Sequence, residues 1–354
     1  MIDRDDLRAA VSAGIVNEAQ AASLASLADA RRGARENLDA GDEPFELFKG
    51  FNEVFIVVGL VILAVGWVGV VSINLLTEIG GLLNRVTMAA AVGAGILWVL
   101  SEYFIRRRRM VAPAITLSIF WAGNAAIGLT AAFSEPFMVG REDYGSLLLP
   151  LTLATLVLAV YWFRFRVPFA MAMIALGTFA VALVWTATAA GTPQSPIDLF
   201  LLSADGPFAW VTLILGVAVF AAAMSFDMSD PHRVTRRSAN GFWLHLIAAP
   251  ALVNTVALSL LEQDTNGAFL LLAVFLTIMA LVAIAIDRRS FLIAGVGYCV
   301  ALSFTLFDGE GGAIGVLLLG LVLLFLGAGW ERIRAVVLGI FGPLLPLHRL
   351  PPSA

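Results

Sequence analysis

Charged residues are scarce in this chain, and their scarcity excludes most soluble proteins. Only 14% of the 354 residues are Asp, Glu, Lys or Arg, whereas 60% are hydrophobic and the mean hydropathy is +0.91. Soluble globular domains have about 25% charged and about 45–50% apolar residues, and a water-soluble fold of this size has no way to cover so much apolar surface. The composition therefore predicts an integral membrane protein that crosses the bilayer several times.

Reactive and metal-binding side chains are also few. The single cysteine, Cys299, excludes a disulfide-stabilised scaffold, and the net charge of −4 excludes a basic nucleic-acid binder. The three histidines have neither zincin nor Cys/His spacing, and the sequence has no Walker-type glycine loop. We therefore expect no cofactor, no metal and no nucleic-acid partner.

Residues 1–50 differ from the rest because they are polar and carry the whole net charge of −4. They lack the apolar core of a signal peptide. Two short helices are predicted, the first ending at Gly14 and the second opened by a capping-box pair, Asn17 and Gln20, and running to about residue 35. We expect a cytoplasmic N-terminal helical hairpin followed by a polar linker.

Ten apolar runs follow, most of them close to the ~20 residues that a helix needs to cross a bilayer; the fourth and ninth are the shortest. They are too long and uninterrupted for the alternating strands of an outer-membrane barrel. We therefore predict an all-α polytopic transmembrane helix bundle over residues 51–334 and an interfacial C-terminal tail over 335–354. The runs are residues 52–74, 86–105, 111–133, 146–163, 168–190, 208–226, 241–261, 268–286, 291–307 and 313–331.

The placement of arginines predicts the orientation. With ten spans both termini share a side, and the loops on that side contain all basic residues outside the tail except Arg85 and Arg141. Because Lys and Arg are enriched in short cytoplasmic loops, we expect both termini in the cytoplasm. Four consecutive arginines in one loop are either an orientation signal alone or also a contact for anionic lipid headgroups; they are Arg106, Arg107, Arg108 and Arg109.

His245 is the one histidine inside a predicted span, and it is a candidate site residue. Pro250 follows on the same helix and leaves a backbone carbonyl without its donor, and Asn254 comes four residues later. These groups either hydrogen-bond to a neighbouring helix or line a polar cavity in which His245 titrates near neutral pH.

Four more residues are candidates for substrate binding. Asn124 near mid-span, with Trp121 close by, needs a polar partner, and small neighbours allow another helix to approach. Glu53 follows Lys49 by four residues, and Glu102 precedes Arg106 by four, so both are either interfacial ion pairs or the lining of a cytoplasmic mouth. Asp287 and Arg288, adjacent in sequence, are a further candidate interfacial pair.

The chain resembles a family of uncharacterised prokaryotic polytopic membrane proteins that carry a domain-of-unknown-function label. The resemblance rests on Ala13-Gly14-Ile15, on Gln20-Ala21, on the Gly/Leu/Val-rich run 57–67 and on the Gly-Trp-Glu-Arg sequence at 329–332. It implies a helical hairpin before the first span and a bacterial inner-membrane location. It implies no activity.

Three hypotheses of function remain. The first is a permease-like protein that handles a small or amphipathic molecule through His245, Asn254, Asn124, Trp121, Glu102 and Glu53. The second is a membrane scaffold or assembly subunit that docks partners through its N-terminal tail. The third is a lipid-processing membrane enzyme, which we rank below the first because the sequence contains no catalytic motif.

Overall fold

The computed structural model describes residues 10–17, 20, 24, 51–76, 81–135, 138, 143–204, 206–231, 233, 235–306, 310–344 and 346–351. These ranges contain helices and connecting turns, and no strand. Nine helices among them are long and apolar enough to cross a membrane, and the apolar segment Ser290–Thr305 is shorter. The described residues therefore form an all-helical, multi-pass membrane protein. The helices are α3 (Phe51–Leu76), α4 (Leu82–Ser101), α5 (Ala112–Phe133), α7 (Leu148–Phe165), α8 (Pro168–Ala190), α9 (Phe208–Ser229), α10 (Arg236–Leu261), α11 (Asn266–Ala285), α12 (Ser290–Leu306), α13 (Glu310–Ala328) and α14 (Trp330–Phe341).

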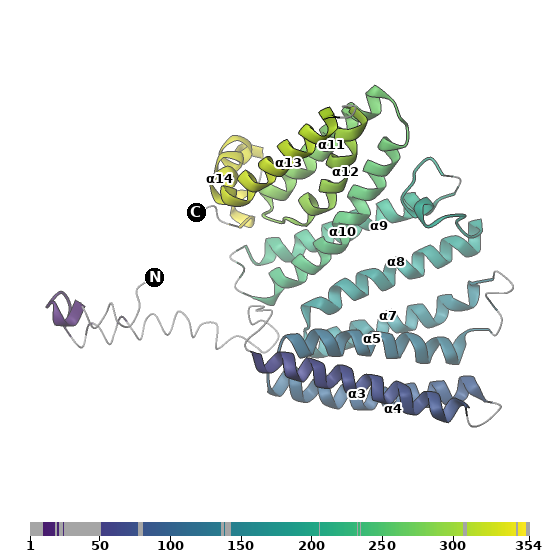
Figure 1. The fold of residues 1–354 in the computed structure, drawn as a ribbon. Helices are drawn as coiled ribbons and strands as arrows, with labels where there is room; N and C mark the ends of the chain where they lie inside the picture. Colours follow the sequence, from purple (N-terminus) through teal and green to yellow (C-terminus); the bar gives the residue numbers. More distant parts are fainter. Residues whose placement is uncertain are drawn as a thin grey trace.

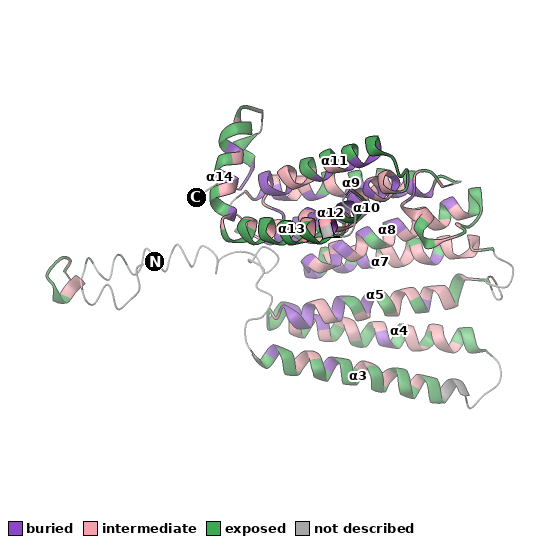
Figure 2. Cartoon of the chain, turned by 45° about the horizontal axis from the view of Figure 1, so that its top comes forward, coloured by how far each residue is buried: buried purple, intermediate pink, exposed green. Residues whose placement is uncertain are grey.

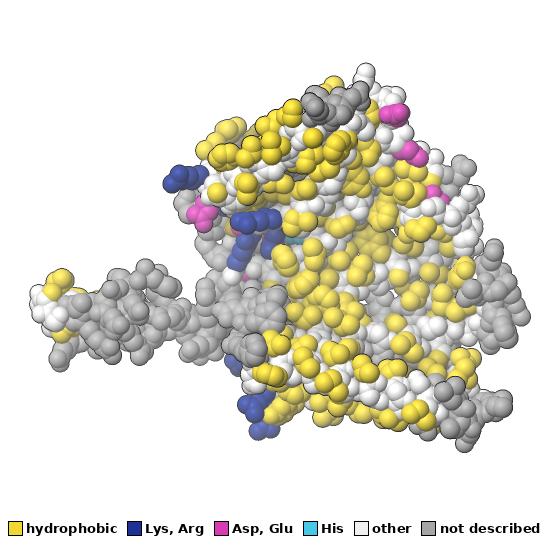
Figure 3. All heavy atoms as spheres, in the orientation of Figure 1, with side chains coloured by type: hydrophobic (Ala, Val, Ile, Leu, Met, Phe, Trp, Pro, Cys, Tyr) yellow, Lys and Arg dark blue, Asp and Glu magenta, His cyan; other side chains and the backbone are white. Residues whose placement is uncertain are grey.

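Successive long helices run in alternating directions, so their connections alternate between two ends of the bundle (Figure 1). One end holds the turns that join α4 to α5, α7 to α8, α9 to α10 and α11 to α12, and all four turns contain arginines. We call it the arginine-rich end. The start of α3 and the C-terminus lie at this end as well (Figure 1). In Figure 3 the visible basic side chains lie at this end, so the fold gathers the arginines as the sequence predicts.

Helix α10 is the centre of the second half of the bundle. Half of the residues in its most apolar 18-residue segment are buried, compared with 6% of the residues in the corresponding segments of α3 and α13. It packs against α8, α9, α11 and α12. Exposed side chains cover most of α3 and α13 (Figure 2), which is the pattern of helices that face lipid, where apolar groups need no protein cover.

The last spanning helix ends earlier than predicted. The helix breaks at Gly329, and α14 then runs across the arginine-rich end (Figure 2). Its residues Trp330, Arg334 and Leu338 are buried, at the spacing of one helical face, and α14 contacts α11. The predicted boundary at 334 therefore falls inside a helix, and the structural break comes at 329.

Two features of the predicted N-terminal hairpin lie within the described residues, and both are present. Gly14 has a φ of 70°, and the N–H of Ile15 donates to the carbonyl oxygen of Ala10 at 3.0 Å, which is a glycine-terminated helix end. Asn17 and Gln20 exchange side chain-to-backbone hydrogen bonds of 3.0 and 2.8 Å, as a capping box does. The rest of the hairpin, and Lys49, lie outside the described residues.

Candidate functional site

A buried carboxylate near the arginine-rich end joins three parts of the bundle. Asp227 lies in the last turn of α9 and is 5% exposed. Its Oδ2 accepts a hydrogen bond from Nε of Arg288 at 2.9 Å, and its Oδ1 accepts one from Nη2 of the same residue. Nε2 of the fully buried His245, on α10, lies 3.0 Å from Oδ2. We call Asp227, His245 and Arg288 the buried triad; its bidentate arginine–carboxylate pair is among the stronger polar contacts in proteins.

The local sequence makes room for this triad. Asp230, just after α9, accepts hydrogen bonds of 2.9 Å from both the N–H and the hydroxyl of Thr235, the N-cap of α10. The turn brings α10 back along α9, where Gly241 faces Asp227. A Cβ at position 241 would overlap the Asp227 carboxylate and lie 3.2 Å from the carbonyl oxygen of Ala223. Glycine is therefore required for the two helices to approach around the carboxylate.

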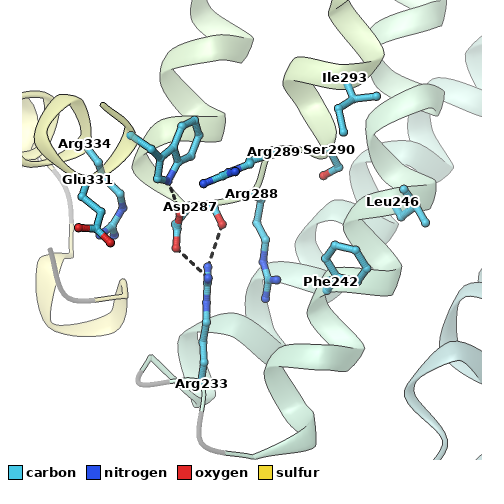
Figure 4. A pocket seen from close by; sticks show the side chains of 11 residues that line it. Arg233, Phe242, Leu246, Asp287, Arg288, Arg289, Ser290, Ile293, Glu331 and Arg334 are labelled. Atoms are coloured by element: carbon cyan, nitrogen blue, oxygen red, sulfur yellow. Dashed lines mark hydrogen bonds and ion pairs between the residues drawn. The ribbon is translucent and has the colours of Figure 1, made fainter. Parts of the chain in front are cut away.

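A second ion pair joins Arg233 to Asp287, next to Arg288 of the triad (Figure 4). Nη1 of Arg233 is 2.7 Å from Oδ2 of Asp287, and its Nη2 donates to the Asp287 carbonyl oxygen at 2.9 Å. The indole N–H of Trp330 donates to Oδ1 of Asp287 at 2.6 Å, which attaches α14 to the turn between α11 and α12. Burial and the neighbouring charge of Arg288 lower the pKa of the Arg233 guanidinium. The cations here are therefore partly desolvated and repel one another.

The backbone at this second pair is strained. Arg233 has a φ of 53° and Asp287 a φ of 56°. For residues with a Cβ, the left-handed conformation costs roughly 1–2 kcal/mol each, and such strain concentrates at functional sites. The ion pair and the Trp330 hydrogen bond hold the strained turns in place.

A pocket of about 480 Å³ opens between these residues and the helices α10, α12 and α14. One side is charged, with Arg233, Asp287, Arg288, Arg289, Glu331 and Arg334. The other side is apolar, with Phe242 and Leu246 from α10 and Ile293 from α12 (Figure 4). Ile293 is 74% exposed and Phe242 is 41% exposed, so the apolar side opens on the lipid-facing surface of the bundle. We call this cavity the arginine pocket.

Two side chains on the pocket wall, those of Arg289 and Ser290, have hydrogen-bond donors with no acceptor among the described residues. Arg289 is exposed, and within the described ranges its contact is with the ring of Trp330, 4.8 Å from the guanidinium carbon. The buried hydroxyl of Ser290 has no hydrogen-bond partner among the described atoms. Ser290 is also the first residue of α12, where backbone N–H groups lack intrahelical acceptors and the helix dipole favours an anion. All these donors suit a phosphate or carboxylate group.

Comparisons of the chain with protein-family models, with curated proteins and with solved structures find no match. The resemblance drawn from the sequence therefore stays a prediction. The function has to be argued from the geometry of this site.

Of the six predicted site residues, only His245 belongs to the buried triad, and it lies behind the arginine pocket. Asn254 is nine residues further along α10, which corresponds to about 13.5 Å of helix. The hydroxyl of Thr255, the residue after Asn254, is used within the fold, because it donates to the Ala251 carbonyl oxygen of its own helix at 2.6 Å. Neither His245 nor Asn254 is among the residues that line the arginine pocket.

Trp121 and Asn124 lie together in a different place. Both border a groove of about 340 Å³ whose lining comes from α4, α5 and α7 and is almost wholly apolar. Asn124 donates from Nδ2 to the Ala90 carbonyl oxygen on α4 at 2.8 Å, and Trp121 stacks on Tyr161 with ring centroids 5.2 Å apart. The interhelical hydrogen bond is the packing role that the sequence left open for Asn124.

Glu53 and Glu102 hold helices together at two further points. The buried Glu53 accepts a hydrogen bond of 3.0 Å from the N–H of Ala112, the first residue of α5. Glu102 pairs with Arg106 at 3.2 Å, as its spacing predicts, and also with Arg164 at 2.6 Å. The structure gives each of these glutamates a contact of its own and does not bring them to His245.

One predicted pair is wrong. Asp287 and Arg288 are neighbours in sequence but point to different partners, since Asp287 binds Arg233 whereas Arg288 binds Asp227. The positive φ of Asp287 turns the backbone sharply between them. The sequence does not single out Asp227, because this residue directly follows the predicted span 208–226. An acidic residue at the end of a span is expected to lie at the membrane interface. The spacing of Asp227 from a histidine on the next helix was the available signal.

Proposed function

We propose that this protein is a permease-like membrane protein whose ligand is an anionic amphiphile, with a phosphate or carboxylate headgroup and an apolar tail. The observation that carries the proposal is the two-sided lining of the arginine pocket. Four arginines and two carboxylates form one side, and exposed apolar side chains of α10 and α12 form the other. An anion relieves the excess of positive charge, and a tail lies against the apolar side.

The location of the pocket agrees with a lipid-like ligand. It lies at the arginine-rich end, which we assign to the cytoplasmic side of the inner membrane because short cytoplasmic loops are enriched in Lys and Arg. The cytoplasmic leaflet carries anionic lipids, and each basic residue near it gains about 1 kcal/mol. An anionic lipid can therefore reach the pocket sideways, past Phe242 and Ile293. The same argument supports headgroup contacts for the arginines at 106–109.

The apolar side distinguishes a lipid from a free inorganic anion. A free phosphate makes only the polar contacts, whereas a lipid also removes the exposed surfaces of Phe242, Leu246 and Ile293 from water or detergent. Each buried methylene group contributes about 0.8 kcal/mol. We therefore expect tighter binding of a short-chain phospholipid than of inorganic phosphate.

Binding to the purified protein in a neutral detergent tests this proposal. The ligands are dihexanoyl-phosphatidylglycerol, dihexanoyl-phosphatidylcholine and inorganic phosphate. We expect the anionic lipid to bind at least about tenfold more tightly than the zwitterionic one. Both carry the phosphate, but the excess of arginines repels the quaternary ammonium of phosphatidylcholine, and a factor of ten corresponds to about 1.4 kcal/mol. Equal affinity for the two lipids, or no binding of either, contradicts the proposal.

A matched pair of variants places the binding site. Arg289→Gln removes an exposed cation from the pocket wall, and Arg332→Gln removes an exposed cation from α14 that does not line the pocket. We expect Arg289→Gln to weaken binding of phosphatidylglycerol by about tenfold and Arg332→Gln to leave it within about twofold, as weak screened surface charges do. Equal effects of the two substitutions would indicate general attraction to a basic surface.

The geometry favours binding over the other two hypotheses. The lipid-processing hypothesis needs Glu53, Glu102 and His245 to converge at one interface, whereas His245 is fully buried and each glutamate is engaged elsewhere. If neither lipid binds, a scaffold that docks partners through the N-terminal tail becomes the favoured hypothesis.

A further inference from the structure

We propose that each anion bound in the arginine pocket is accompanied by one proton, taken up by His245. The inference rests on the proposed function, since it concerns the same pocket. It follows from one feature of the structure, which is that Arg288 belongs to both the pocket wall and the buried triad.

Arg288 is shared between two possible anions. In the structure its guanidinium is committed to Asp227, with a further hydrogen bond of 2.7 Å from Nη2 to the Ser238 carbonyl oxygen. An anion that enters the pocket competes with Asp227 for this charge. To the extent that Arg288 turns to the ligand, the Asp227 carboxylate loses its cation inside the protein.

A carboxylate in this position cannot stay ionised without a partner. Asp227 is buried, and leaving a buried charge uncompensated is strongly unfavourable. His245 is already in contact with the same carboxylate oxygen. A proton on its imidazole supplies the missing positive charge without any movement of the helix.

The second ring nitrogen is open to that proton. When the neutral imidazole donates from Nε2 to Asp227, its Nδ1 carries a lone pair, and Nδ1 has no hydrogen-bond partner among the described residues. The rings of Phe220 and Phe291 make T-shaped contacts with the His245 ring, with ring centroids 5.4 and 5.8 Å apart. The proton comes from solution and binds Nδ1, and Nε2 keeps its hydrogen.

The charges balance in both states. Without ligand, Asp227 and Arg288 neutralise each other and His245 is neutral. With ligand, Arg288 neutralises the anion and protonated His245 neutralises Asp227. Binding of the anion without the proton would leave the Asp227 carboxylate without a cation in the protein interior.

Apart from Asp227 itself, whose protonation would persist in His245→Gln, no other described group is placed to take the role of His245. Helices α8 and α11 contribute no charged residue to its surroundings over their described lengths. The titratable and charged side chains on the elements that pack against α10 near His245 are Asp227 on α9, Arg233 and Arg288 in the turns, and Tyr298 and Cys299 on α12. The arginines keep their protons near neutral pH, and neither tyrosine nor cysteine gains a positive charge by protonation.

Isothermal titration calorimetry of the whole protein with dihexanoyl-phosphatidylglycerol, repeated in buffers of different ionisation enthalpy, counts the protons. We expect close to one proton taken up per lipid at neutral pH. The affinity should then fall about tenfold for each further pH unit. Binding with no proton uptake and no pH dependence overturns the proposal.

Two variants assign the proton. His245→Gln keeps a donor for Asp227 but cannot become charged, so it should bind the lipid more weakly and without proton uptake. Asp227→Asn removes the competing carboxylate, so it should bind more tightly than the native protein, at an affinity independent of pH. Unchanged proton uptake in either variant contradicts the assignment to His245, and the measurement on the native protein stands even if one variant does not fold.

The outcomes separate the two proposals. Binding of the anionic lipid without protons leaves the proposed function in place and rejects the coupling. Failure of the lipid to bind at any pH rejects both.

Discussion

Substituting Gly241 by alanine is a sharp test of the buried triad, because this change ordinarily stabilises a helix. Alanine in a helix interior is favoured over glycine by about 1 kcal/mol. At position 241, however, a Cβ would overlap the Asp227 carboxylate, and the Ala223 carbonyl oxygen is only 3.2 Å away on another side. The carboxylate therefore has to move away from Arg288 and His245.

The expected magnitude follows from the ion pair. Separating a buried charge from its partner costs about 3–5 kcal/mol, which outweighs the gain in helix propensity. We expect Gly241→Ala to lower the free energy of unfolding by about 2–4 kcal/mol, measured by detergent-induced unfolding followed by tryptophan fluorescence. Gly123→Ala, in α5, is the matched control because nothing lies within 4 Å of its added Cβ, and it should be neutral or stabilising.

A double substitution distinguishes a clash of the added methyl group with the carboxylate from clashes with other atoms. In the Asp227→Ala background the carboxylate is absent, so the further change of Gly241 to alanine should cost much less than it does in the native protein. If Gly241→Ala behaves like Gly123→Ala in the native background, or costs the same with and without Asp227, the triad geometry described here is wrong.

Two further predictions concern helix contacts away from the pocket. Glu53→Ala removes the buried acceptor for the Ala112 N–H and should lower the free energy of unfolding by about 1–3 kcal/mol, whereas the same change at the exposed neighbour Asn52 should have little effect; equal effects at 52 and 53 would contradict the proposed anchoring of α3 to α5. Tyr161→Phe removes a buried hydroxyl that lies 2.9 Å from the Ser101 hydroxyl, and since Ser101 keeps its bond to the Leu97 carbonyl oxygen, the loss should be about 1 kcal/mol. A double-mutant cycle with Ser101→Ala that gives no coupling energy would contradict the second.

The broad architecture could be predicted from the sequence because its signals are long and additive. Apolar runs of about 20 residues identify membrane helices individually, and alternating arginine-bearing loops reproduce the two ends of the bundle. The capping box at Asn17 and Gln20 was also readable, since a cap depends on residues three apart.

The candidate site could not be predicted in the same way. The contacts of Asp227 with His245 and Arg288 join residues 18 and 61 positions apart, and the pairing depends on how the helices pack. The separation of Asp287 from Arg288 depends on a positive φ at one residue, which a spacing argument does not foresee. Polar residues near the ends of spans have several partners within reach, and tertiary packing selects among them.

Movement of a labelled lipid across vesicles that contain the protein tests the central claim most directly. Short-chain phosphatidylglycerol with a fluorescent label on one acyl chain, which leaves the headgroup unchanged, is added outside, and a membrane-impermeant reductant then measures how much has become protected. The account predicts faster protection than in protein-free vesicles, no acceleration for the corresponding phosphatidylcholine, and a smaller effect with Arg289→Gln than with Arg332→Gln. Equal rates for both lipids, or rates no faster than in protein-free vesicles, would contradict it.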